Sequence, residues 1–264
     1  MVRATSSKRI AVMGLAAVVA ALSGCGPLPP EAVQQLQQGQ RHYEAGKYVE
    51  AVKALDGFLA GWGGTDAAAE AYYIRGQSYL KLGQPKRCRA DLERALTRCK
   101  RPDLCARVHV ALGSMDWAAG HTSTAVDHYR RALPELPDRS PRDIVLYRLG
   151  VGLQQAGKWS QARQHLAELV GGYPASPVIT AARLRFSWTY EYFTIQVGAY
   201  SSGNSAAKEV ERLRKAGLNA EKQLDTRSGR PLHAVRVGHY PTYAEAERGL
   251  TRVRRVSSDA IIVP

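Results

Sequence analysis

The sequence has few acidic residues and few cysteines, and the apolar run near its start is too short to cross a membrane. Its 264 residues include 23 Asp and Glu against 37 Lys and Arg, so the formal net charge is +14. A basic balance fits nucleic acid, an anionic membrane or another polyanion, and alone it favours none of them. With 45% apolar and 23% charged residues, the composition excludes a disordered or fibrous chain and suggests one large or two modest globular units.

Basic residues precede that apolar run, and small residues follow it. Arg3, Lys8 and Arg9 lie before Ile10–Leu22, and Ser23-Gly24-Cys25 lies after it. A bilayer requires about 20 apolar residues, more than this run contains. A basic start, a short apolar core and small exit residues are typical of a secretory signal peptide, which we predict over residues 1–24. Export from the cytoplasm argues against nucleic acid as the partner of the basic chain.

The end of this leader, Leu22-Ser23-Gly24-Cys25, resembles the lipobox of bacterial lipoproteins. The resemblance implies that Cys25 becomes the first mature residue and carries acyl chains, palmitate among them. Each buried CH₂ contributes about 0.8 kcal/mol, so several chains anchor a protein firmly. Gly26 at the next position implies the periplasmic face of the outer membrane, and the proline-rich residues 25–31 are predicted to form a short stiff tether. The alternative is an ordinary signal peptide in which Cys25 stands by chance.

Four sets of residues recur at a spacing of 37 residues after the tether. The sets are Gly39, Gly76, Gly113 and Gly150; Gly46, Gly83, Gly120 and Gly157; Ala51, Cys88, Ala125 and Ala162; and Leu55, Leu92, Tyr129 and Leu166. Small residues in the first and third sets let two helices approach closely, and the large residues of the fourth set fill the space between them. The spacing therefore predicts a solenoid of repeated helical pairs.

The later units, Leu112–Pro137 and Leu149–Pro174, resemble the tetratricopeptide repeat (TPR). The resemblance implies four repeats over residues 32–189, including a capping helix over 176–185, and a concave groove that binds a protein partner. Residues expected to line this groove are Tyr43, Tyr73, Leu80, Val110, Trp117 and Tyr147. The alternative is that these side chains pack onto neighbouring helices within the stack. The basic run over residues 86–101 is interpreted as a solvated helix face.

Three cysteines lie in the repeat region. Cys88 and Cys99 are 11 residues apart on one predicted helix, which separates them by about 16 Å. A disulfide requires Cα atoms within about 7 Å, so this pair is excluded. Cys99 and Cys105 flank the turn at Pro102, and we predict a disulfide between them, with Cys88 free in the buried set of small residues. No histidine has a spacing that suits a metal site.

The pattern changes near residue 190, where strand-like alternation replaces the helical period. Strands are predicted over 193–197, 220–224, 232–237 and 259–263, and helices over 205–216 and 242–253. Thr242, with Glu245 three residues later, is predicted to cap the second helix. The order predicts a four-stranded antiparallel sheet with both helices on one face.

Two half-motifs, Ile195–Tyr200 and Val235–Gly238, together with Tyr243–Ala246 and the apolar last strand, resemble the SPOR domain. The resemblance covers residues 190–264. It implies binding of peptidoglycan glycan strands that lack stem peptides, on the sheet face opposite the helices. RNA-recognition modules share this strand order, but the third strand lacks their aromatic residues.

Alternation along the strands identifies the candidate binding face. With Ile195 and Val235 packed on the helices, the residues expected on the opposite face are Tyr192, Thr194, Gln196, Leu232 and Arg236. Gln196 corresponds to a glycan-contacting glutamine of the family. Many members carry arginine at the position of Ala234, and Arg236 is expected to substitute for it.

The expected fold class is α + α/β multidomain: an all-α TPR solenoid followed by an α+β domain of βαββαβ, ferredoxin-like order. The resemblances imply a non-enzymatic adaptor that holds a protein partner near peptidoglycan, in division or another envelope process. No catalytic cluster, metal site or cofactor is expected. Two alternatives remain open. One is a TPR scaffold that assembles an envelope complex for outer-membrane protein insertion, secretion or motility; the other is a hydrolase with acids drawn from distant positions.

Overall fold

The computed structural model describes residues 27–226 and 231–264. The predicted signal peptide and Cys25 lie outside these residues, so the structure does not bear on the lipid anchor. The chain divides into two compact units, with a boundary between Met115 and Asp116. This boundary falls inside one helix of the repeat region, so the second unit contains the last repeats together with the C-terminal domain.

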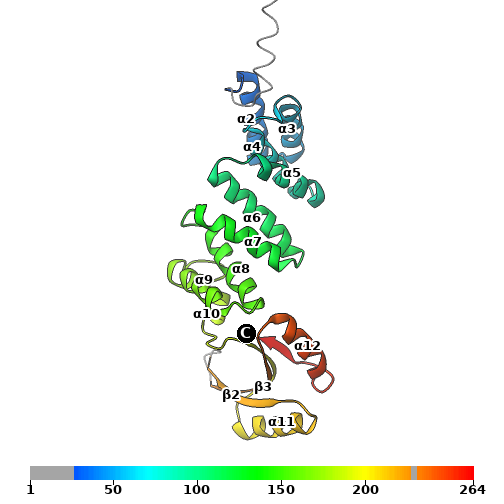
Figure 1. Cartoon of the computed structure of the whole chain (residues 1–264), viewed down its shortest axis with the longest axis vertical. Coiled ribbons are helices and arrows are strands. Elements are labelled where there is room, and N and C mark those ends of the chain that lie inside the picture. The colour runs from blue at the N-terminus through cyan, green and yellow to red at the C-terminus, as the bar shows by residue number, and fades with distance from the viewer. Residues whose placement is uncertain (1–26, 227–230) are drawn as a thin grey trace, which may run out of the picture. The chain divides into compact units, whose positions relative to one another are not determined.

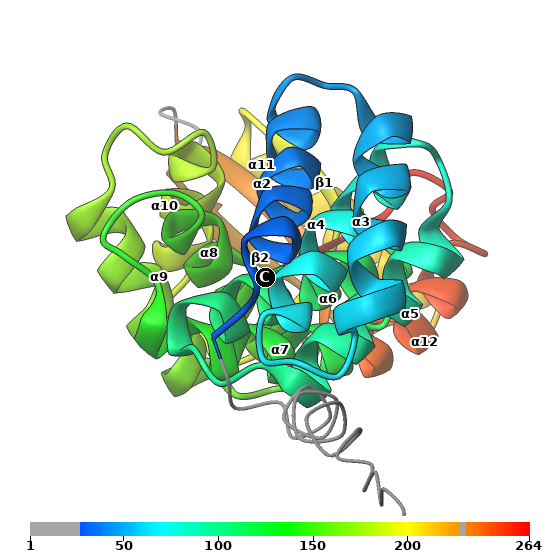
Figure 2. The ribbon, with the colours of Figure 1, turned by 90° about the horizontal axis from the view of Figure 1, so that it is seen from above.

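The first unit is helical. Its helices are α2 (Pro30–Glu44), α3 (Tyr48–Trp62), α4 (Ala68–Lys81), α5 (Pro85–Arg98) and most of α6 (Pro102–Ala118). Helix α2 packs against α3, and α4 packs against α5 (Figures 1 and 2). Gly46 and Gly83 have φ values of 73° and 70° at the turns inside these pairs. Glycine adopts positive φ without steric penalty, which explains why this set of glycines recurs.

The second unit continues the helical pairs. Its helices are α7 (Thr122–Ala132), the short 3-10 helix η1 (Leu133–Glu135), α8 (Arg142–Gln155), α9 (Trp159–Gly172) and α10 (Ile179–Phe186). Helix α10 is the predicted capping helix, and Ala182 on its inner side is fully buried. Ala182 packs in a cluster with Leu146 of α8 and Leu166 of α9, so α10 is attached to the last repeat.

The recurring small and large residues meet as the sequence predicts. Leu55, Leu92, Tyr129 and Leu166 are fully buried. A Cβ atom placed on Gly150 would lie 2.6 Å from Cγ of Leu166, and one on Gly39 would lie 2.5 Å from Cγ of Leu55. Glycine is required there because the paired helices leave no room for a methyl group.

We expect Gly150→Ala to destabilise the second unit by about 1–2 kcal/mol, because overpacking a core outweighs the better helix propensity of alanine. Gly171→Ala, near the end of α9, is the matched control, since nothing lies within 4 Å of its added Cβ. The control is expected to be neutral or stabilising. Urea denaturation of both variants measures the difference, and equal midpoints would contradict the packing argument.

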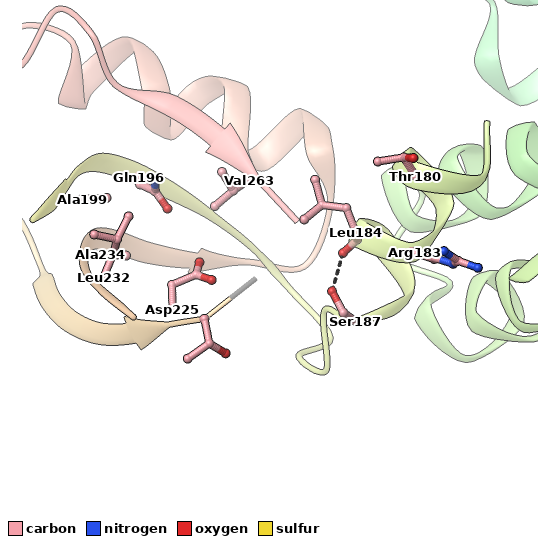
Figure 3. A pocket seen from close by; sticks show the side chains of 11 residues that line it. Thr180, Arg183, Leu184, Ser187, Gln196, Ala199, Asp225, Leu232, Ala234 and Val263 are labelled. Atoms are coloured by element: carbon pink, nitrogen blue, oxygen red, sulfur yellow. Dashed lines mark hydrogen bonds between the residues drawn. The ribbon is translucent and has the colours of Figure 1, made fainter. Parts of the chain in front are cut away.

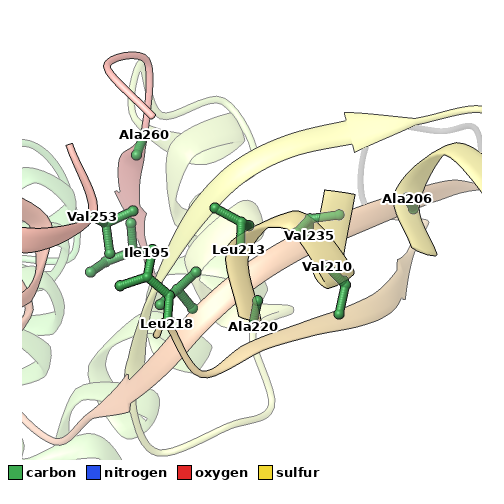
Figure 4. Packing of buried hydrophobic residues seen from close by; sticks show 10 residues of the cluster. Ile195, Ala206, Val210, Leu213, Leu218, Ala220, Val235, Val253 and Ala260 are labelled. Atoms are coloured by element: carbon green, nitrogen blue, oxygen red, sulfur yellow. The ribbon is translucent and has the colours of Figure 1, made fainter. Parts of the chain in front are cut away.

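The C-terminal domain contains a four-stranded antiparallel sheet. Its elements are β1 (Phe193–Tyr200), α11 (Gly203–Lys215), β2 (Ala220–Asp225), β3 (Leu232–Tyr240), α12 (Tyr243–Val253) and β4 (Ile261–Val263), with strand order β2-β3-β1-β4. Ile195, Val235 and Leu213 belong to the buried core between the sheet and the helices (Figure 4). The predicted fold class, a TPR-like solenoid followed by an α+β domain, is confirmed.

The third strand is longer than predicted, and the predicted helix cap is present. Strand β3 continues to Tyr240, three residues beyond the predicted end, and passes through Gly238 at a φ of 69°. The predicted cap of α12 is confirmed: Thr242 Oγ1 accepts from the Glu245 N–H, and the Glu245 carboxylate accepts from the Thr242 N–H.

Candidate functional site

The face of the sheet opposite α11 and α12 carries polar side chains from three strands. In the register, Gln196 of β1 lies opposite Arg236 of β3, which lies opposite Glu221 of β2. Ile195 is fully buried in the core on the helix side, so its neighbours Thr194 and Gln196 point to the other face. We call this surface the open face.

A cavity of about 820 Å³ lies between the open face and helix α10 (Figure 3). Its lining from the sheet includes Gln196, Ala199, Asp225, Leu232, Ala234 and Val263. Its lining from the helix consists of Thr180, Arg183, Leu184 and Ser187. Two of the sequence-predicted glycan residues, Gln196 and Leu232, therefore line the cavity, and both are partly exposed.

Arg236 lies on the predicted face, but the expectation that it is available to a ligand needs correction. Only 3% of its side chain is exposed. Its guanidinium donates to Gln223 Oε1 and to the Asp225 carboxylate, and it stacks over the Trp188 ring at 4.9 Å from the centroid. A buried arginine held by a carboxylate and an aromatic ring is fixed in place. Arg236 therefore supports the floor of the open face.

Thr194 and Tyr192 also lie outside the cavity lining. Thr194 is 1% exposed, and its hydroxyl donates to the Val237 carbonyl at 3.4 Å. Tyr192 stacks on His239 with ring centroids 4.0 Å apart, and burial raises the pKa of its hydroxyl. These two predicted residues therefore do not line the cavity.

Aromatic residues join the last repeat to the sheet. Trp159 of α9 packs on Phe193 with ring centroids 4.8 Å apart, and its indole N–H donates to the Pro241 carbonyl at 3.1 Å. The Trp188 indole N–H donates to the Tyr192 carbonyl at 2.9 Å. Arg163 of α9 donates to the Trp188 carbonyl at 2.7 Å. These contacts hold α9, the segment after α10 and β1 together.

Sequence reasoning missed Asp225, Trp188 and the lining from α10. The available signal was the aromatic cluster Trp188, Tyr190 and Tyr192 just before the first strand. Such a cluster at a domain junction is typical of a packed interface, because aromatic side chains bury large areas.

The predicted groove residues of the repeats are mostly packed within the stack. In the first unit, Tyr43 and Tyr73 pack against buried clusters between the helices, Val110 is half-buried, and Leu80 is 41% exposed. Burial raises the pKa of Tyr73.

In the second unit, the guanidinium of Arg148 lies 5.8 Å from the centroid of the half-buried Trp117 ring. Tyr147 packs against the cluster around Leu146 and Leu166. The tyrosines thus follow the alternative of packing within the stack, and the binding of a partner by these residues stays a prediction.

The cysteines of the repeat region pair as expected. Cys99 and Cys105 form a disulfide, and Cys88 is a buried free cysteine. Burial raises the pKa of the Cys88 thiol to about 11, which keeps it protonated and unreactive at neutral pH.

The basic run is engaged in surface ion pairs. Arg94 pairs with Asp91 at 3.3 Å and Lys100 pairs with Asp66 at 2.9 Å. Arg101 pairs with Asp103 at 2.8 Å. The Lys100–Asp66 and Arg101–Asp103 pairs are exposed on both sides, and pairs of this kind contribute little to stability. Asp91 is itself buried and also pairs with Arg75, but its partner Arg94 is exposed, which fits the interpretation of a solvated helix face.

Across residues 27–226 and 231–264, no group of three or more potential metal ligands is found. Within the same residues, no helix has both the length and the apolar character that a membrane span needs.

Family comparisons match both parts of the chain. Residues 189–264 match the SPOR domain. Residues 36–102 and 75–141 match one tetratricopeptide repeat family, and residues 145–176 match another. Both are typically binding modules without catalysis, and no enzyme family is among the matches. No curated protein matches the sequence.

Several solved structures are similar to the chain. MamA of AMB-1 is 23% identical over 61% of this chain and 81% of its own, with a TM-score of 0.48. MamA of MSR-1 is 25% identical over 62% and 87%, with a TM-score of 0.45. Pseudomonas aeruginosa PilF is 18% identical over 59% and 66%, with a TM-score of 0.45.

The helical pairs, the open-faced sheet and the family matches lead to one identification. TPR repeats are typical of protein–protein interaction, and SPOR domains are typical of peptidoglycan binding in the periplasm. The chain carries tetratricopeptide repeats followed by a C-terminal SPOR domain.

Proposed function

We propose that the protein is a non-enzymatic adaptor that binds peptidoglycan glycan strands lacking stem peptides at the open face of its SPOR domain. The observation that carries this proposal is the cavity of about 820 Å³ on that face, with Gln196 and Leu232 in its lining. Cavities of about 300–1,000 Å³ suit small ligands or short segments of a polymer.

The chemistry of the cavity suits a sugar chain. Sugar hydroxyls require hydrogen-bond donors and acceptors, and the Gln196 amide supplies both. The Ser187 hydroxyl donates to the Leu184 carbonyl at 2.9 Å, so its oxygen adds an acceptor. The apolar faces of sugar rings require apolar contact, which the partly exposed Leu232 and Val263 supply. A mixed lining of this kind favours a sugar chain over a purely apolar ligand.

The remaining parts of the chain support a role in the cell envelope. Acyl chains on Cys25 would anchor the protein at the periplasmic face of the outer membrane. The repeats would bind a protein partner, with the exposed Leu80 as one contact. The adaptor would then hold that partner near glycan that is remodelled during division or another envelope process.

A pull-down with purified sacculi tests the proposal. The whole mature chain is mixed with untreated sacculi and with sacculi from which an amidase has removed the stem peptides, and we expect enrichment on the stripped glycan. Gln196→Ala should weaken binding about fivefold, the equivalent of one hydrogen bond of about 1 kcal/mol.

Gln161→Ala is the matched control, since Gln161 is exposed on α9 and is absent from the cavity lining. It should bind as the wild type does. Equal and negligible binding of the wild type to both kinds of sacculi would refute glycan recognition and leave the TPR scaffold of an envelope complex as the function.

A further inference from the structure

The side of helix α10 that faces the open face carries an exposed leucine between two hydroxyl side chains. Leu184 is 50% exposed, and in Figure 3 it points from α10 toward the sheet. Thr180 and Ser187 lie on the same side of the helix, because residues three and four apart share a helix face. Among the described residues, no buried cluster contains Leu184.

The position of α10 is fixed by contacts on its other sides. Ala182 is fully buried against the last repeat. Arg185 donates to Gln154 Oε1 of α8 at 3.0 Å. Immediately after α10, Trp188 is tied to the sheet through Arg236. A wall that is already held in place binds a ligand without an ordering cost.

A positively charged side chain lies beside this wall. Arg183 is among the residues that line the cavity and is exposed, and in Figure 3 its guanidinium points away from the sheet. Among residues 27–226 and 231–264 no hydrogen bond or ion pair engages that guanidinium, so it can turn toward a ligand without losing a partner. The carboxylate of Asp225 faces the same cavity but pairs with Arg236. The Arg183 cation is therefore not neutralised by that carboxylate.

We infer that α10 is a second wall of the glycan site, so that a sugar strand is held between Leu184 and the sheet while the Arg183 side chain turns to pair with a lactyl carboxylate. This inference rests on the proposed function and names the ligand more closely. Hydrolysis of the amide between muramic acid and the stem peptide leaves a free lactyl carboxylate on each stripped sugar. An arginine that reaches the strand would favour the stripped glycan over the intact one through a charge-assisted hydrogen bond.

The wall is tested with the whole mature chain and amidase-stripped sacculi. Leu184→Glu removes the apolar contact and adds a charge that repels the carboxylates, so binding should fall about tenfold. Leu224→Glu is the matched control, because Leu224 is 64% exposed on β2 and does not line the cavity. It should bind as the wild type does, and unchanged thermal midpoints show that both variants fold.

The role of the Arg183 charge is tested by changing first the arginine and then the carboxylates of the glycan. Arg183→Ala should weaken binding to stripped sacculi about fivefold, and Arg248→Ala, exposed on α12, should not. Amide coupling of the lactyl carboxylates with ethanolamine should weaken the wild type and remove the difference between wild type and Arg183→Ala.

The possible failures are distinguishable. Wild-type binding by Leu184→Glu, or an equal loss by Arg183→Ala on coupled and uncoupled glycan, would overturn the second wall as stated. If Gln196→Ala still lost binding in that case, the glycan would lie on the sheet alone and the proposed function would stand. Failure of the wild type to bind stripped sacculi would instead refute the proposed function.

Discussion

Trp159→Ala is expected to lower the free energy of unfolding of the second unit by about 3 kcal/mol, in the range for truncation of a buried aromatic side chain. Trp159 is 8% exposed. The substitution removes its packing on Phe193 and the hydrogen bond to the Pro241 carbonyl. Because these contacts join the last repeat to the SPOR domain, their loss should lower the stability of both parts.

The measurement is urea denaturation followed by far-UV circular dichroism. Tyr190→Ala is the control, since Tyr190 belongs to the same aromatic region but is 42% exposed, and its loss should cost less than about 1 kcal/mol. We also expect Trp159→Phe to retain part of the stability, because a smaller ring still packs on Phe193. Equal midpoints for Trp159→Ala and Tyr190→Ala would show that the junction is not a cooperative interface.

The architecture was predictable because its determinants are local and periodic. The glycines at Gly46 and Gly83 mark turns that need positive φ, and the small residues mark close helix contacts such as Gly150 on Leu166. Strand alternation likewise placed Gln196 on the face opposite the helices. Each of these signals depends on a few residues close in sequence, so it can be read without knowledge of distant contacts.

The environment of the site was not predictable in the same way. Alternation places Arg236 on the open face but says nothing of the neighbours that bury it. Those neighbours come from the register of β2, which supplies Asp225, and from Trp188, which lies in a segment without strand or helix periodicity. The contribution of α10 depends on the same segment.

Arg236→Ala is expected to destabilise the second unit by about 3 kcal/mol. Removal of one member of a buried ion pair leaves the other without compensation, and Asp225 has only 15% of its side chain exposed. The Trp188 ring loses its cation contact as well. Arg236→Lys should recover little, because an ammonium group lacks the planar fork that bonds both Gln223 and Asp225. Urea denaturation of the variants measures these losses.

Glycan binding by the same variants separates support of the site from direct contact. If Arg236 acts by holding Asp225 and Trp188, Asp225→Asn alone should weaken binding, and adding Arg236→Ala should add little, since both changes break one unit. If Arg236 instead touches the sugar, its replacement should cost about as much in the Asp225→Asn background as in the wild type. We expect the first result, because an arginine side chain that is only 3% exposed offers a ligand almost no contact. Additive losses of binding in the double-variant cycle would show that Arg236 contacts the glycan directly.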